Sequence, residues 1–362
     1  MWITTENPAI IFEDSAVGKM KKEVWDASEE EIGAILKEYE IPSPPELGKA
    51  GSYIQTTPRH KLVENRRKND VVLITIGSTE CHGRHAPSGH DSFQVSQVLE
   101  GVRRYTAKKG KPVNLAFNPI NYGAHPYHHI GIPGTVIIPP DVVKETLIYV
   151  MLGLWNDGFR KQIIVNNHGH FWVMETALHE FMYRYQLPGV FQVLDWPKAI
   201  REFLVPGVRE DSLETPFVHA DETETSWGLL LFPEMIDMEV AEKAQPKRFL
   251  PGDHWMDAAE SFHRPHRWSE GEGHAAIELS GTPEGVVGDP TRASARKAKR
   301  PVVALLKYLT LCADEILEAF PPGKVPPVEE VTLRTAKEME PYLKEPQSKG
   351  WKSVYSLPRI GM

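Results

Sequence analysis

Short apolar runs alternate with longer amphipathic stretches from residue 71 onward. The runs Val71–Ile76, Val113–Phe117, Lys161–Val165 and Val190–Leu194 are rich in β-branched and aromatic residues, which predicts buried strands. Between them, apolar residues recur at helical spacing, which predicts helices over 93–105, over 141–155 with Asp141 as the cap, and from His170 to about Tyr185. Such alternation predicts an α/β fold in which helices cover both faces of a mostly parallel sheet.

The segments outside this alternation predict three parts of the chain. Residues 1–70 contain an acidic helical piece and a Pro-rich bend, and we expect them to form an extension packed on the core. Residues 71–320 form the main domain, with further helices over 222–231 and 293–319. Residues 321–362 are expected to be a Pro-rich tail.

Polar pairs follow two of the predicted strands at the same spacing. Glu80 and His82 come after the first strand, and His168 and His170 come after the third. Residues two apart in an extended segment point to the same side, and the carboxyl ends of parallel strands lie at one edge of a sheet. The pairs should therefore converge, together with Asp91, whose two oxygens can bridge two cations. Three imidazoles and two carboxylates suit zinc or manganese better than magnesium or calcium.

A third polar segment could supply proton transfer. His219, Asp221, Glu222 and Glu224 lie within six positions and could act as general acid and base, with geometry deciding which. Other interpretations stay open, because each pair alone could be a hydrogen-bonded strand end. Asp221 and Glu222 could also simply stabilise a helix N-terminus through its dipole.

Composition narrows the class of protein. The 362 residues are 41% hydrophobic, which is ample for a core, and two cysteines exclude a disulfide framework and predict a reducing, cytoplasmic location. A net charge of -8 argues against a nucleic-acid surface, and no apolar run approaches membrane-spanning length. A small-molecule partner is expected, with neither nucleic acid nor membrane.

Five motifs occur in an order that resembles the creatininase (creatinine amidohydrolase) family. They lie at Gly77–Asp91, Tyr122–Thr135, Asn166–Gly169, His219–Ser226 and Gly285–Pro290. The resemblance spans about residues 70–300 and implies a creatininase-like three-layer α/β/α sandwich with a mostly parallel central sheet. It also implies a homo-oligomer, commonly a hexamer.

The resemblance also implies roles for individual residues. Glu80, Asp91 and His168 would hold one divalent ion, and His82, Asp91 and the residue at position 170 would hold a second. His219 and Glu224 would be the catalytic residues beside them. The expected substrate contacts are Tyr122, His125, His128, Trp172 and Glu222.

This chain departs from the family pattern at two places. Creatininase has Glu where His170 stands here, and a neutral ligand makes the metal centre more electrophilic. Creatininase-like members have Ser near Tyr122, whereas this chain has Ala124 and His125 in a longer, His-rich loop. Both changes make creatinine itself a less suitable substrate.

The expected activity is therefore hydrolysis of a small polar ring. A hydroxide shared by two divalent ions, zinc or manganese, would attack a ring carbonyl. The family includes a branch that opens a cyclic diketo-inositol, 3-dehydro-scyllo-inosose, to a keto-acid in inositol catabolism, and the size and loops of this chain resemble that branch. The alternatives are a cyclic amidohydrolase acting on creatinine-like rings or formamides, a peptide-trimming peptidase, and a non-catalytic metal-binding protein.

Overall fold

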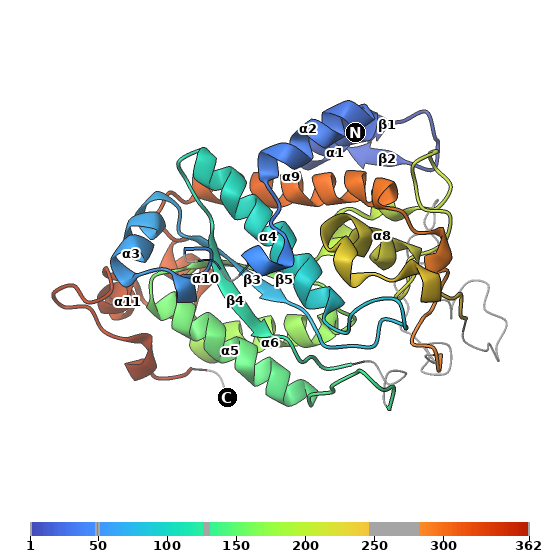
Figure 1. The fold of residues 1–362 in the computed structure, drawn as a ribbon. Helices are drawn as coiled ribbons and strands as arrows, with labels where there is room; N and C mark the ends of the chain where they lie inside the picture. Colours follow the sequence, from blue (N-terminus) through green and yellow to red (C-terminus); the bar gives the residue numbers. More distant parts are fainter. Residues whose placement is uncertain (1, 48, 50, 126–130, 246–281, 361–362) are drawn as a thin grey trace.

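Four strands form a parallel sheet in the order β4-β3-β5-β6. The computed structural model describes residues 2–47, 49, 51–125, 131–245 and 282–360 (Figure 1). The strands are β3 (Val71–Ile76), β4 (Asn114–Ile120), β5 (Lys161–Asn166) and β6 (Val190–Asp195). The four predicted strands and their parallel arrangement are thus confirmed.

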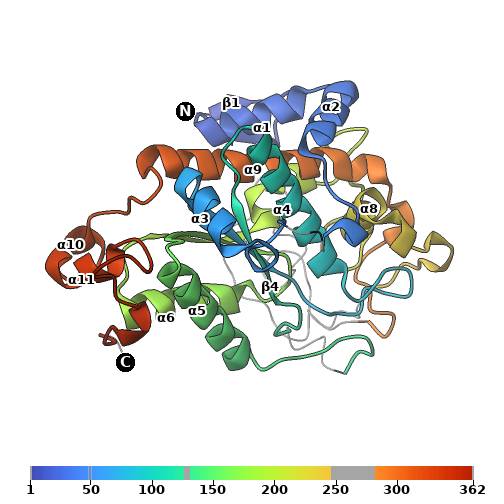
Figure 2. The ribbon, with the colours of Figure 1, turned by 60° about the vertical axis from the view of Figure 1, so that its left-hand side comes forward.

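Helices cover both faces of this sheet. Side chains of β3 alternate between two hydrophobic clusters, with Val71 and Leu73 in one and Val72 and Ile74 in the other. The first cluster is covered by α4 (His90–Lys108) and α9 (Ala295–Ala319), and the second by α5 (Pro140–Asn156) and α6 (Phe171–Tyr185). Figures 1 and 2 show these helices on opposite sides of the strands, which confirms the three-layer α/β/α arrangement.

The strand order places two diverging loops at one edge of the sheet. The central neighbours β3 and β5 pair in register from Val71↔Lys161 to Ile76↔Asn166. The chain leaves β3 toward α4 on one face and leaves β5 toward α6 on the other. Loops that diverge in this way at the carboxyl ends of adjacent parallel strands form the usual ligand site of such sheets. Both polar pairs predicted from the sequence follow these two strands.

The N-terminal segment packs on the first face. A two-stranded antiparallel pair, β1 (Trp2–Thr4) and β2 (Ile11–Glu13), precedes α1 (Ala16–Asp26) and α2 (Glu29–Tyr39). Both helices contact α9, and side chains from this segment belong to the first hydrophobic cluster.

The remaining elements surround the same core. They are α3 (Arg59–Lys68), α7 (Trp196–Ala199), α8 (Glu222–Leu231), α10 (Val328–Val331) and α11 (Ala336–Leu343). The predicted helix over 222–231 is confirmed as α8, which packs on α9. Met339 and Tyr342 of α11 are buried in the second cluster, so the segment after residue 321 adds to the core.

Several helix starts differ from the sequence prediction, and α9 begins at Ala295, two residues later than predicted. Helix α4 begins at His90, three residues earlier than predicted, so Asp91 lies in its first turn. Helix α5 begins at Pro140, and Asp141 lies in its first turn instead of capping it. Proline suits the first helical position because it needs no hydrogen-bond partner there. No helix within the described ranges is both long and apolar enough to cross a membrane.

Candidate metal centre

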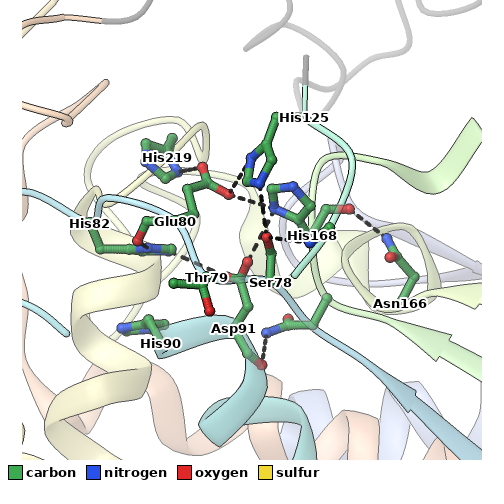
Figure 3. A network of polar contacts seen from close by, with 12 residues as sticks. Ser78, Thr79, Glu80, His82, His90, Asp91, His125, Asn166, His168 and His219 are labelled. Atoms are coloured by element: carbon green, nitrogen blue, oxygen red, sulfur yellow. Dashed lines mark hydrogen bonds and ion pairs between the residues drawn. The ribbon is translucent and has the colours of Figure 1, made fainter. Parts of the chain in front are cut away.

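Imidazoles and carboxylates converge at the carboxyl edge of the sheet (Figure 3). They come from the loop after β3, the first turn of α4, the loops after β4 and β5, and the start of α8. The members of this cluster are Glu80, His82, Asp91, His125, His168, His219 and Glu224. Predicted metal ligands and predicted catalytic residues are thus brought together.

Asp91 lies between two imidazoles. Its Oδ1 is 3.3 Å from Nε2 of His82, and its Oδ2 is 3.1 Å from Nδ1 of His168. The residue is only 2% exposed. A carboxylate whose two oxygens face different ligand residues is placed to bridge two cations.

Two glutamates complete the acidic lining. Glu80 Oε2 is 2.5 Å from His168 Nδ1, and its Oε1 is 3.0 Å from His219 Nδ1. Glu224 Oε2 lies 3.4 Å from His82 Nε2 and accepts a hydrogen bond from the Ala220 amide at 2.5 Å. Ala220 has φ of 48°, a left-handed conformation that is costly for alanine, and such strain is typical of functional sites.

Four imidazoles in the cluster are oriented by backbone carbonyls. In each of the four rings, the nitrogen that points away from the carboxylates lies within hydrogen-bond distance of a carbonyl oxygen. The four distances are 3.1 Å from His82 Nδ1 to Glu80 O, 3.0 Å from His168 Nε2 to Ala124 O, 2.7 Å from His219 Nε2 to Cys81 O, and 3.2 Å from His125 Nε2 to Val136 O. A carbonyl can only accept, so that nitrogen carries the proton and the other nitrogen of a neutral ring carries a lone pair. Metal-binding histidines are held in this way.

The electrostatics of the cluster favour a cation. Burial alone would lower the pKa of His82, but Glu224 and Asp91 raise it well above its ordinary value. Burial also opposes the charge on His168, yet Glu80 and Asp91 raise its pKa to about 10. In the absence of an ion, protons therefore balance the carboxylates, and a divalent cation can take their place.

The donors fit a pair of divalent ions. Glu80, His125 and His168 form one group of candidate ligands and His82, His219 and Glu224 form another; within each group the ligand atoms lie within 4.8 Å of one another. Asp91 contacts one imidazole of each group. Mixed nitrogen and oxygen donors are those that zinc and manganese accept.

His170 lies beside the cluster but in neither group. Its ring centroid is 4.5 Å from that of His168, the residue is 0% exposed, and neither ring nitrogen has a hydrogen-bond partner. Burial lowers its pKa well below the ordinary value, so the ring is neutral and able to ligate a metal. The structure does not place it against His82, and its role as ligand stays a prediction.

The predicted substrate contacts divide into three cases. Tyr122 and Trp172 are 54% and 48% exposed, and both are close in sequence to residues that pack at the site. His125 has a fully buried side chain inside the cluster. His128 lies outside the described residues.

The structure argues against a substrate contact at Glu222. Its carboxylate accepts hydrogen bonds from the Glu214 and Thr215 amides and the Thr215 hydroxyl, and it pairs with Lys297. Residues two apart on a helix point in nearly opposite directions, so Glu222 and Glu224 cannot both face the cluster. Asp221 caps α8 by accepting from Thr223 and Glu224 amides, which agrees with the helix-terminus interpretation.

A supporting polar network beside the cluster was not predicted from the sequence. The His90 ring stacks on His82 with centroids 4.8 Å apart, and His90 Nε2 lies 3.2 Å from Gln94 Oε1. Gln94 donates to Asn167, which donates to the Asp91 carbonyl at 2.8 Å. The spacing of His90 and Gln94 on a helix that starts at the site was the available signal.

A second missed residue anchors the helix that carries Glu224. The ring of His85, which is 2% exposed, lies 2.8 Å from the Thr225 hydroxyl through Nε2. Burial and the nearby His82 lower the pKa of His85 to about 4. A neutral, buried imidazole therefore fixes the start of α8 against the loop after β3.

Comparison with known proteins gives matches over most of the chain. The family model described as creatininase, creatinine amidohydrolase, matches residues 57–314. The 3-dehydro-scyllo-inosose hydrolase of Thermotoga maritima is 44% identical over 310 residues, which cover 86% of this chain and 98% of that protein. The mycofactocin precursor peptide peptidase of Mycolicibacterium smegmatis is 26% identical over 253 residues, covering 68% of this chain and 84% of that one.

Solved structures share the fold at low sequence identity. A creatininase described with manganese has a TM-score of 0.54 and 19% identity, covering 76% of this chain and 100% of its own. A putative creatinine amidohydrolase from Bacteroides fragilis has a TM-score of 0.56 and 19% identity, covering 73% of this chain and 95% of its own. A creatininase variant described as Zn-Zn type has a TM-score of 0.55, with 19% identity and coverage of 76% and 100%.

Proposed function

The chain belongs to the creatininase family, and from that premise we propose that it is a divalent-metal-dependent hydrolase that opens 3-dehydro-scyllo-inosose to a keto-acid in inositol catabolism. The observation that carries the substrate is the 44% identity to a hydrolase of that name over 98% of its length. The alignment therefore covers nearly the full length of that hydrolase.

We propose that two ions, zinc or manganese, bind in the cluster. Glu80, Asp91 and His168 would hold one, as their mutual distances of 2.5 and 3.1 Å support. His82 and Asp91 would hold the other, with His170 as the third donor, since its ring is neutral and both of its nitrogens are buried without a hydrogen bond. When bound, such a pair lowers the pKa of a water molecule and polarises a substrate carbonyl.

Differences in exposure support our assignment of some residues to the ions and of others to the substrate. The side chains of Glu80, His82, Asp91 and His168 are at most 3% exposed. Those of His219 and Glu224 are 12% and 13% exposed. We therefore assign these two partly exposed side chains to contact with the substrate.

Opening a cyclic 1,3-diketone requires one proton to be moved. Hydroxide from water adds to a ring carbonyl carbon, and the bond from that carbon to its neighbour between the two carbonyls breaks. The electron pair passes into the remaining carbonyl as an enolate, which takes a proton on carbon. The OH of one water molecule thus enters the new carboxylic acid group and its remaining hydrogen enters the new C–H bond, and the acid then ionises by releasing its own proton.

Glu224 is the residue best placed to carry that proton. Although burial opposes it, His82 holds the pKa of Glu224 below its usual value, so the carboxylate is ionised and can accept a proton from water. The Ala220 amide fixes its Oε2. His219 is held by Glu80 and the Cys81 carbonyl, and its Nδ1 lies 3.8 Å from Glu224 Oε2, so it would position Glu224 beside the substrate.

A substrate panel tests this function. Metal-loaded protein is incubated separately with 3-dehydro-scyllo-inosose, creatinine, a cyclic formamide and a short peptide, and products are followed by proton NMR. We expect ring opening of the diketo-inositol with a kcat/KM at least about 100-fold above that for the other three. Preferred release of ammonia or an amine would make the protein an amidohydrolase, and preferred peptide cleavage would make it a peptidase.

A further inference from the structure

His125 is held with one ring nitrogen directed into the metal cluster. It follows β4, and its side chain is fully buried. Nε2 lies 3.2 Å from the Val136 carbonyl oxygen and 3.1 Å from the Ser78 hydroxyl. Because the carbonyl can only accept, Nε2 is the nitrogen that carries a proton, and in the neutral form of the ring Nδ1 carries a lone pair.

That lone pair lies beside the first pair of predicted ligands. His125 Nδ1 is 3.8 Å from Glu80 Oε2, which is itself 2.5 Å from His168 Nδ1 (Figure 3). The rings of His125 and His168 meet edge to face with centroids 4.5 Å apart. The three donor atoms lie within 4.8 Å of one another, a spacing that a single ion can span.

One backbone segment fixes both imidazoles. His168 Nε2 is within hydrogen-bond distance of the Ala124 carbonyl, one residue before His125. Val136, further along the same loop, accepts from His125. The loop after β4 therefore sets the tautomer and direction of both rings, as the outer hydrogen bonds of metal sites do.

We propose that His125, through Nδ1, is an additional protein ligand of the ion held by Glu80, Asp91 and His168. The inference rests on the metal centre proposed above and is independent of the substrate. It also replaces the substrate contact that the sequence predicts for His125. A second imidazole gives this ion two nitrogen and two carboxylate donors, which favours zinc or cobalt over manganese.

Cobalt titration of the metal-free protein tests the proposal directly. Wild type, His125→Ala and His85→Ala are titrated with Co²⁺, and affinities are measured by competition with a chromophoric chelator. Visible absorption and X-ray absorption of the cobalt proteins report coordination and the number of imidazoles. The matched control His85 is also a buried imidazole, but it bonds Thr225 and belongs to neither donor group within the described residues.

We expect His125→Ala to bind one of its two ions at least about 100-fold more weakly, since even outer-shell changes cost about 10- to 100-fold. Its cobalt spectrum should lose one imidazole, while that of His85→Ala should match wild type. His125→Gln removes Nδ1 but carries its amide near the former position of Nε2, where it can donate to Val136. It carries the same test if the alanine variant does not fold, which circular dichroism of the metal-free protein shows.

The outcomes separate the two proposals. If wild type binds cobalt and His125→Ala binds it with the same affinity and spectrum, His125 is not a ligand. An unchanged metal site with a raised KM would return it to the role of substrate contact and overturn the inference. If wild type itself binds no divalent ion, the metal centre fails and the inference fails with it.

Discussion

Replacing Asp91 with Asn should weaken the binding of both metal ions. Asn keeps the volume of the side chain but removes its charge and turns one oxygen into a donor. In the structure one Asp91 oxygen is 3.3 Å from His82 Nε2 and the other is 3.1 Å from His168 Nδ1. Each candidate ion therefore loses a shared anionic ligand, and one of them meets an N–H group instead.

The size of the effect follows from the charge that is lost. Two unit charges about 4 Å apart interact by about 4 kcal/mol at an effective dielectric constant of about 20. A water molecule in place of the lost oxygen recovers part of this energy. We therefore expect each ion to lose about 2 to 4 kcal/mol of binding free energy, which weakens its affinity by roughly 30- to 1,000-fold.

The assay is isothermal titration of chelator-stripped protein with zinc, together with metal analysis after gel filtration. Asp195→Asn is the matched control, because Asp195 lies at the end of the neighbouring strand β6 and makes its described polar contacts with Asn166 and Lys198. Wild type and the control should bind two ions, and Asp91→Asn should lose both in parallel. If Asp91→Asn keeps one ion at wild-type affinity, Asp91 does not bridge.

Three further comparisons test individual residues. His170→Ala should retain one of the two ions. Glu224→Gln should retain both ions and lose about 100-fold in kcat, as expected for a residue that transfers a proton. Loss of an ion from Glu224→Gln would instead show that Glu224 is a metal ligand beside His82. Burial lowers the pKa of His85 to about 4, so between pH 6.5 and pH 4 the unfolded chain binds a proton at this residue and the folded chain does not. Urea unfolding of the metal-free protein should therefore show that the free energy of unfolding falls by about 3 kcal/mol from pH 6.5 to pH 4, and this loss should be absent in His85→Gln. Equal losses in the two proteins would contradict this prediction. Glu222→Gln should lower the free energy of unfolding by about 3 kcal/mol, because it breaks the buried ion pair and hydrogen bonds of this carboxylate. The KM of this variant should change by less than about twofold. A large rise in KM would show that Glu222 contacts the substrate.

Much of the fold could be predicted because its signals are local. The runs at Val71 and Lys161 are apolar enough to be strands wherever they pack, and alternation with helices implies a parallel sheet. The strand order could not be predicted, because β3 pairs with β4 and β5 through contacts between distant segments. The helices after residue 321 also escaped prediction, because α10 and α11 are short and their propensity is weak.

The candidate site was partly predictable for a related reason. Spacing alone places Glu80 and His82, like His168 and His170, at strand ends, and parallel strands bring such ends together. The direction of each side chain was not accessible. Glu222 points away because a helix turns by 100° at each residue, and His125 enters the cluster because a carbonyl some ten residues later orients its ring. Oligomeric state and cellular location stay predictions.

The most direct test of the account follows ring opening by metal-depleted and metal-restored protein in D₂O, with ¹³C NMR detection. We expect the metal-depleted protein to leave 3-dehydro-scyllo-inosose unchanged. Restored zinc or manganese should convert it to a keto-acid that carries one new carboxylate and deuterium at the carbon formerly between the carbonyls. Equal turnover with and without metal, or no turnover of this substrate beside rapid hydrolysis of a cyclic amide, would contradict it.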